Sequence, residues 1–279
     1  MKLYRTKWGP VLEADGRLCG LGTDLSNEWW DSLAGRDDLC EYLSQGLGKA
    51  RDTSPNVLGH LLAPIGSQEV WAAGVTYHRS REARIKDSQL LGGSDFYDRV
   101  YDADRPELFF KATPHRVVGP KAKIAIRDDS TWSVPEPELA LLITPKGTIV
   151  GYTVGNDVSS RSIEGENLLY LPQAKIWDGC CALGPCVLVS KEPPHSSTEI
   201  RLEIIRNGEQ AFIGATTLAQ MKRDPASLVR YLFRNNSFPS GCYLLTGTGI
   251  VPPDAFTLMA GDEVRITISD IGTLVNTVG

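Results

Sequence analysis

Two apolar runs in the middle of the chain are spaced to pair as a β-hairpin. The first, residues 139–143, reads LALLI, and the second, residues 148–154, is rich in β-branched side chains. A Pro-Lys-Gly turn at 145–147 separates the runs, a pattern typical of two consecutive antiparallel strands. We therefore expect a hairpin whose second strand ends at Gly155-Asn156-Asp157.

Two glutamates stand immediately before the first apolar run. Glu136 and Glu138 are two residues apart, so their side chains leave the same face of an extended strand. Pro135 and Pro137 favour an extended backbone, and Pro137, which lacks an N–H, suits an edge strand or a strand end. The hairpin can bring Asp157 beside both glutamates.

Three converging carboxylates repel one another unless a cation compensates them. Hard oxygen ligands with no nearby cluster of cysteine or histidine suit Mg²⁺, Mn²⁺ or Ca²⁺ better than Zn²⁺. The alternative is a solvated acidic strand edge, with Asp157 serving as an unrelated helix cap.

The composition excludes several classes of partner. With 42% apolar and 23% charged residues, the chain resembles an ordinary globular protein. Its formal net charge is −5 and it has no basic run, which argues against nucleic acid as a partner. We also expect no membrane partner, because there is no apolar signal core and no apolar run near the ~20 residues that span a bilayer. The six scattered cysteines indicate free thiols in a reducing cytoplasm.

The order of predicted elements indicates an α+β fold that is mostly β. Residues 1–67 read as a small N-terminal α/β domain, with one helix after Ser26 and another from Asp37 to about Ala50. Residues 68–279 form a larger catalytic domain of many strands and few long helices, including a hairpin turn at Asn207-Gly208. This order argues against a doubly wound parallel sheet.

The motifs of this larger region resemble the fumarylacetoacetate hydrolase family. They are E-x-E-L-A, then G-Y-T-x-x-N-D-V-S-x-R, then a lysine followed by C-x-L-G-P, and the ending GDEVRITISDIGTLVN. The resemblance implies the family's mixed β-sandwich or β-roll and a homodimer or homotetramer. It also implies that Glu136, Glu138 and Asp157 hold a divalent metal, usually Mg²⁺ or Mn²⁺, and that Arg161 and Lys175 belong to the active site.

Lys175 and Arg161 also allow simpler readings. If Lys175 is buried near a divalent cation, its pKa should be lowered and it can act as a general base or acid. The alternative is that Lys175 lies on the surface or forms a simple ion pair. Arg161 follows Asp157 by four residues, so the two would be one turn apart if Asp157 opened a helix. Arg161 could then clamp a substrate carboxylate or hold the metal ligands in place.

A glycine-rich segment, Thr246-Gly247-Thr248-Gly249, is not a phosphate-binding Walker loop, because no Gly-Lys-Ser/Thr follows. The resemblance places Thr248 against the substrate. The alternative is a tight turn that needs glycine.

One family motif is missing from this chain. Hydrolytic members carry N-Y-x-x-H-x-x-E, whose histidine and glutamate activate water for carbon–carbon bond cleavage. Here Ser80 and Ala83 occupy those two places, and His78 and Glu82 are near but out of register. The departure puts a hydrolase assignment in doubt.

Further motifs, GVTYxxSRE, ELFFKATP and WSVPEPELA, look like the branch of the family that dehydrates 2-keto-3-deoxy sugar acids. That likeness implies catalytic Glu107 and substrate-binding Ser80, Arg81 and Lys111. Glu107 could instead be a polar residue at a strand start, and Lys111 could snorkel from a strand.

The implied reaction is a metal-dependent loss of water from a small 2-keto acid, through a metal-stabilised enolate. Lys175 or Glu107 would be the base, with the other assisting departure of the hydroxyl. The alternatives are a carbon–carbon hydrolase or decarboxylase that shares the same metal, and a non-catalytic family member.

Overall fold

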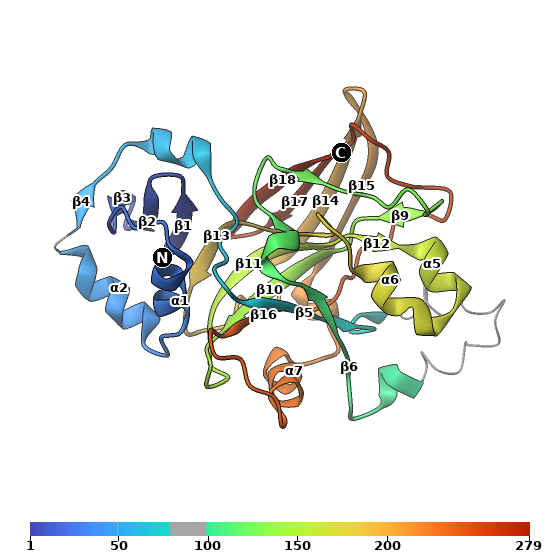
Figure 1. The fold of residues 1–279 in the computed structure, drawn as a ribbon, viewed down its shortest axis with the longest axis horizontal. Helices are drawn as coiled ribbons and strands as arrows, with labels where there is room; N and C mark the ends of the chain where they lie inside the picture. Colours follow the sequence, from blue (N-terminus) through green and yellow to red (C-terminus); the bar gives the residue numbers. More distant parts are fainter. Residues whose placement is uncertain (49, 79–98) are drawn as a thin grey trace.

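The computed structural model describes residues 1–48, 50–78 and 99–279, which form two main β-sheets (Figure 1). The larger sheet runs in the order β4 (Arg51–Asp52), β3 (Arg17–Gly20), β2 (Gly9–Ala14), β1 (Lys2–Thr6), β13 (Cys181–Val189), β11 (Ile149–Asp157), β10 (Pro137–Ile143), β16 (Cys242–Leu245), β5 (Glu69–Gly74) and β6 (Glu107–Ala112), and β7 (Val117–Val118) pairs with β13. The smaller sheet runs β15 (Glu209–Thr217), β14 (Glu199–Arg206), β17 (Glu263–Ile268), β18 (Gly272–Val278) and β8 (Lys123–Ile124), while β9 (Ser133–Val134) pairs with β12 (Ser159–Ser160).

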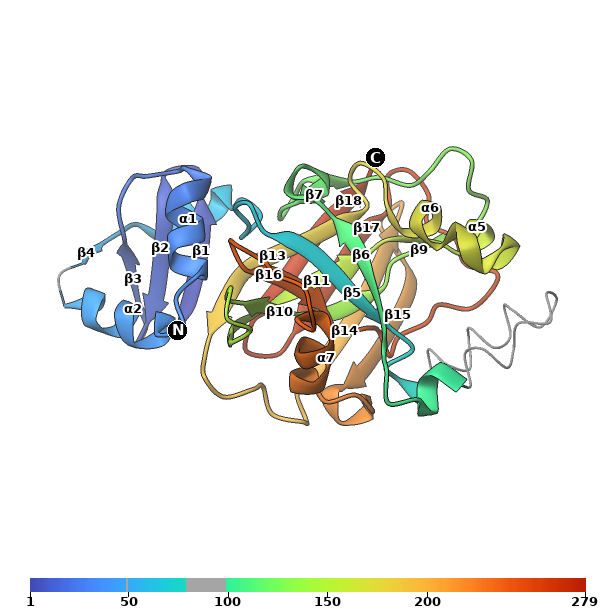
Figure 2. The same cartoon turned by 60° about the horizontal axis from the view of Figure 1, so that its bottom comes forward.

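The helices are short and lie around the sheets. They include α1 (Asn27–Ala34), α2 (Leu39–Leu47), α5 (Arg161–Glu166), α6 (Leu171–Lys175) and α7 (Pro225–Leu232), with 3₁₀ segments at η1 (Pro55–His60), η3 (Pro114–Arg116), η4 (Leu168–Tyr170) and η5 (Leu218–Gln220). Both views place α1 and α2 at one end of the molecule and α5 and α6 at the other (Figures 1 and 2). The prediction of a mostly β, α+β fold is confirmed.

The predicted hairpin is present as β10 and β11. Leu139 pairs with Val154 and Leu141 with Tyr152, and Gly147 takes a φ of +82° in the connecting turn. Because β11 and β16 flank β10, Pro137 lies not at a sheet edge but at a strand end, one of the two places expected for it.

The LALLI run lacks polar alternation because β10 is buried on both faces. Leu139, Leu141 and Ile143 join the core that lies between the two sheets, together with residues of β14, β17 and β18. Ala140 and Leu142 face the other way and join a second core that includes Trp30 of α1 and Leu43 of α2, among others. A polar substitution anywhere in this strand would therefore be buried.

The N-terminal strands continue the large sheet, because Lys2 of β1 pairs with Leu188 of β13. The side chain of Ser26 accepts the N–H of Trp29, which confirms the predicted start of α1. Helix α2 ends at Leu47, shorter than predicted. A division into domains 1–67 and 68–279 stays a prediction.

None of the helices in the described part of the chain combines the length and the apolar character that crossing a membrane requires.

Candidate active site and metal centre

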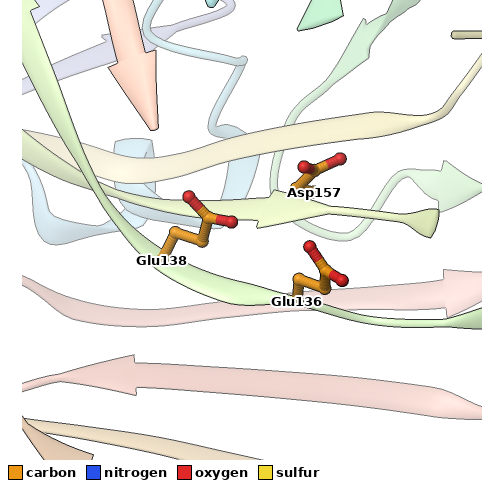
Figure 3. Close-up of side chains that lie close together, drawn as sticks. All are labelled: Glu136, Glu138 and Asp157. Atoms are coloured by element: carbon orange, nitrogen blue, oxygen red, sulfur yellow. The ribbon is translucent and has the colours of Figure 1, made fainter. Parts of the chain in front are cut away.

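Three carboxylates meet at one end of the β10–β11 hairpin (Figure 3). Glu136 precedes β10, Glu138 is its second residue, and Asp157 ends β11. The N–H of Asp157 donates to the carbonyl of Glu136 at 3.0 Å, so the pairing continues up to the cluster. One carboxylate oxygen from each residue lies within 4.8 Å of the others, and all three side chains are buried. The prediction that the hairpin brings Asp157 beside both glutamates is confirmed.

Positive side chains compensate the cluster from within the protein. Lys175, at the end of α6, donates from Nζ to Glu136 Oε2 at 2.7 Å, to Asp157 Oδ2 at 3.1 Å and to the hydroxyl of Ser159. Arg161 Nη2 donates to Glu136 Oε1 at 3.1 Å. Lys175 and Arg161 are thus both buried at the carboxylates, and their place in an active site stays a prediction.

Glu138 is the least compensated carboxylate of the three. Its Oε2 accepts the backbone N–H of Gly247, and its pKa is raised well above the usual range, first by burial and then by the negative charges of Asp157 and Glu136. A divalent cation would relieve this repulsion. Three buried carboxylates offer the hard oxygen donors that Mg²⁺, Mn²⁺ or Ca²⁺ prefer, so the side chains present fit such an ion.

A cavity opens beside the cluster, and its walls come from six segments of the chain. It is lined by Ala73, Gly74, Val75, Phe109, Glu136, Glu138, Asp157, Arg161, Lys175, Gly247 and Thr248. Lys175 Nζ also lies 5.5 Å from the centre of the Phe109 ring. Thr248 lines this cavity and its Oγ1 accepts the N–H of Ile250 at 3.1 Å, while its contact with a substrate stays a prediction.

The wall at Val75 is conformationally strained. Val75 has φ +52°, a value that a β-branched residue rarely adopts and that costs of order 1–3 kcal/mol. The next residue holds the segment in place, because Thr76 Oγ1 donates to the carbonyl of Thr246 at 2.7 Å. Such strain is commonly found at functional sites.

Glu107 adjoins the same wall at Gly74. It begins β6 and pairs with Gly74, and a Cβ on Gly74 would come within 2.0 Å of Glu107 Oε2. A larger residue at position 74 would therefore force this carboxylate to move. Glu107 also lines a second cavity together with Glu164 of α5.

Sequence reasoning missed Glu164, which is 5% exposed despite its charge. It also missed the N–H of Gly247 and the hydroxyl of Ser159 as partners of site residues. The available signals were the acidic I-E-G-E run after Arg161 and the serine inside the N-D-V-S motif.

The expectation that Asp157 could open a helix was wrong. Asp157 is the last residue of β11, and α5 begins only at Arg161, with Ser160 as its N-cap. Arg161 reaches the cluster because the helix starts beside it, and it contacts Glu136 rather than Asp157.

Among the described residues, Lys111 does not line the cavity. Ser80 and Arg81 lie outside the described residues, as does Glu82. Lys111 is fully buried behind Asp157, and its Nζ lies 2.6 Å from Asp157 Oδ1. His78 is exposed and packs edge-on against Tyr101, with ring centres 6.3 Å apart.

Comparisons with known proteins agree with this geometry. "Probable 2-keto-3-deoxyxylonate dehydratase" of Haloferax volcanii is 52% identical over 221 residues, which cover 78% of this chain and 75% of the relative. "2-dehydro-3-deoxy-D-arabinonate dehydratase" of Saccharolobus solfataricus is 46% identical over 217 residues, 77% of this chain and 73% of the relative.

The fold matches a solved structure of "2-keto-3-deoxy-D-arabinonate dehydratase complexed with magnesium and 2,5-dioxopentanoate" with a TM-score of 0.82. That match has 35% identity and covers 100% of this chain and 98% of the other. A family profile described as "Fumarylacetoacetate (FAA) hydrolase C-terminal" matches residues 70–279, which include every residue of the carboxylate cluster. The chain therefore belongs to the fumarylacetoacetate hydrolase family.

Proposed function

We propose that this protein is a divalent-metal-dependent dehydratase of a 2-keto-3-deoxy sugar acid such as 2-keto-3-deoxy-D-arabinonate, with 2,5-dioxopentanoate as product. The observation that carries the proposal is the buried triad of Glu136, Glu138 and Asp157 with Lys175 between two of its members. Two relatives at 52% and 46% identity carry the names of dehydratases of this substrate class, and the name of a solved structure states magnesium together with that product.

Glu136, Glu138 and Asp157 would hold the ion, for which Mg²⁺ is our first choice and Mn²⁺ or Ca²⁺ are alternatives. Bound there, a divalent cation supplies Lewis acidity that polarises the substrate's 2-keto group and makes the protons on C3 more acidic. The second role of the triad is to fix Lys175, because two of the carboxylates accept its N–H groups.

The cavity walls orient a small keto acid. The hydroxyl of Thr248 and the guanidinium of Arg161 both reach this space and can bind the substrate carboxylate. Phe109 and Val75 supply apolar walls that limit access of water. We also propose that Ser80 and Arg81 take part in substrate binding.

Lys175 and Glu107 form the proton-transfer pair. One of them takes a proton from C3, and the other gives a proton to the C4 hydroxyl, which leaves as water. Loss of a proton from C5 and return of one to C3 leave an enol at C4–C5. Loss of the enol's hydroxyl proton and addition of a proton at C4 then yield the aldehyde of 2,5-dioxopentanoate. Both residues adjoin the cavity wall at β5, Lys175 directly and Glu107 over Gly74.

Elimination fits this chain better than hydrolysis does. Hydrolytic members of the family activate water with a histidine and a glutamate, and this chain has Ser80 and Ala83 in those places. No attacking water is required to remove the C4 hydroxyl.

We further propose a cytoplasmic homodimer or homotetramer with neither nucleic acid nor membrane as partner. All six cysteines are free, which supports a reducing compartment, and membership of the family supports the oligomer.

The test is a product analysis with purified protein, Mg²⁺ and two substrates offered separately, 2-keto-3-deoxy-D-arabinonate and an acylpyruvate. We expect 2,5-dioxopentanoate from the first, abolished by a chelator and restored by added metal. Cleavage of the acylpyruvate without dehydration of the sugar acid would refute the proposal and favour the hydrolase alternative.

A further inference from the structure

Lys111 is a charged side chain without any contact with solvent. It lies in β6 and its exposed fraction is 0%. Its Nζ lies 5.2 Å from the centre of the Trp177 ring, and the thiol of Cys180 donates to its backbone carbonyl at 3.8 Å. A lysine buried this completely requires compensating partners, because a lone ammonium in the interior is very costly.

Three oxygens surround the ammonium of Lys111. Nζ lies 2.6 Å from Asp157 Oδ1 and donates to the carbonyls of Val158, at 2.9 Å, and of Lys175. Two of its three N–H donors go to the carbonyls, and the ion pair with Asp157 Oδ1 holds the ammonium on its third side. Lys111 is not among the described residues that line the cavity.

Through these contacts Lys111 connects the segment that holds the metal-ligand candidate Asp157 with the segment that holds the acid–base candidate Lys175. Asp157 and Val158 stand at the end of β11, whereas Lys175 ends α6. Asp157 is consequently held on both sides, with Oδ1 against Lys111 and Oδ2 against the ammonium of Lys175. The main chain of Lys175 is tied to the same point, which fixes where its side chain starts.

We infer that Lys111 is a positioning residue of the metal centre, which fixes the Asp157 carboxylate and the backbone of Lys175 without touching the substrate. The expected loss of metal affinity does not depend on the proposed function, whereas the expected loss of turnover rests on it. Without Lys111, one oxygen of a buried carboxylate loses its ion-pair partner and two buried carbonyls lose their donor. Comparable outer partners of metal ligands are worth about 10–100-fold in metal affinity or activity.

The experiment compares K111M and K111Q with wild-type protein and with K146M. The control removes a lysine that pairs with Asp37 but is 82% exposed. Mn²⁺ affinity is measured by calorimetry on protein shown to be folded by circular dichroism, and kcat and KM are measured at saturating metal.

We expect K111M to bind Mn²⁺ about 10–100-fold more weakly and to lose kcat, while KM at saturating metal stays within about twofold of wild type. K146M should match wild type in every measurement. If K111M does not fold, K111Q, which keeps two N–H donors but no charge, provides the same comparison.

Two results would overturn the inference. Mn²⁺ affinity within about twofold of wild type would show that Lys111 does not hold the metal ligands. A tenfold rise in KM with unchanged metal affinity would instead make it a substrate contact. The calorimetric result stands even if wild-type protein dehydrates no sugar acid, so failure of the proposed function remains distinguishable.

Discussion

Replacing Lys175 by methionine separates its two roles, which are to compensate the charge of the carboxylates and to transfer a proton. The side chain is 1% exposed and donates to Glu136 at 2.7 Å and to Asp157 at 3.1 Å. Methionine keeps an unbranched side chain of similar length but supplies no charge. Removing one partner of a buried ion pair typically costs about 3–5 kcal/mol, so the metal-free variant should be less stable than wild type by about that amount.

A bound divalent ion would compensate the same two carboxylates. Saturating Mg²⁺ should therefore return most of the stability that K175M loses, because the ion replaces the missing positive charge. It should not return activity, since removal of a general acid or base lowers kcat by about 10²–10⁴-fold.

The assays are denaturant unfolding with and without Mg²⁺, and steady-state turnover at saturating metal. The control is K146M, whose exposed pair with Asp37 should affect neither measurement. Turnover of K175M within about tenfold of wild type would refute the acid–base role. An equal loss of stability with and without Mg²⁺ would refute the account of charge compensation.

Three further predictions concern single contacts or the metal itself. The pKa of Glu138 is raised in the folded protein, so its contribution to the free energy of unfolding is complete below the ordinary pKa of 4.5. That contribution is lost as pH rises through the higher pKa of the folded state. The free energy of unfolding of metal-free wild type should therefore fall over this pH range. The free energy of unfolding of E138Q should not fall over the same pH range, and calorimetry should show weak binding of Mg²⁺ to this variant. If the stability of E138Q depended on pH as that of wild type does, the raised pKa would not belong to Glu138. G74A should displace the Glu107 carboxylate, because Oε2 would lie 2.0 Å from the new Cβ. This variant should lower kcat about as much as E107Q does. The control G59A, which has open space around the new Cβ, should leave kcat unchanged. Exhaustive chelation should lower the melting temperature and abolish turnover, and Mg²⁺ should restore both; full activity in the chelated protein would exclude the metal mechanism.

The convergence of the three carboxylates was predictable from the sequence because its geometry is local. Spacing by two places Glu136 and Glu138 on one face, and a single hairpin turn brings Asp157 to them. The same holds for the buried strand β10, whose uninterrupted apolar run predicts burial on both faces.

The roles of Arg161, Lys111 and Glu164 depend on contacts that spacing does not encode. Arg161 meets Glu136 because α5 starts at the end of a short strand pair, and the four-residue interval from Asp157 pointed to a continuous helix instead. Lys111 and Glu164 acquire their surroundings only when β6 lies against α5 and α6, segments more than forty residues away in the sequence.

The central claim is that residues around the triad remove a proton from C3 of a 2-keto acid, and proton exchange tests it most directly. A 2-keto acid without a C4 hydroxyl, such as 2-oxobutanoate, is incubated in D₂O with protein and Mg²⁺ and followed by proton NMR. We predict metal-dependent loss of the C3 proton signal with wild-type protein, and loss of that exchange in one of K175M and E107Q, which identifies the base. The contradicting result has three parts. Wild-type protein dehydrates the sugar acid, catalyses no deuterium exchange at C3 of 2-oxobutanoate, and leaves C3 of the recovered sugar acid unlabelled. Proton removal at C3 would then not be a separate reversible step, and the proposed mechanism would be wrong.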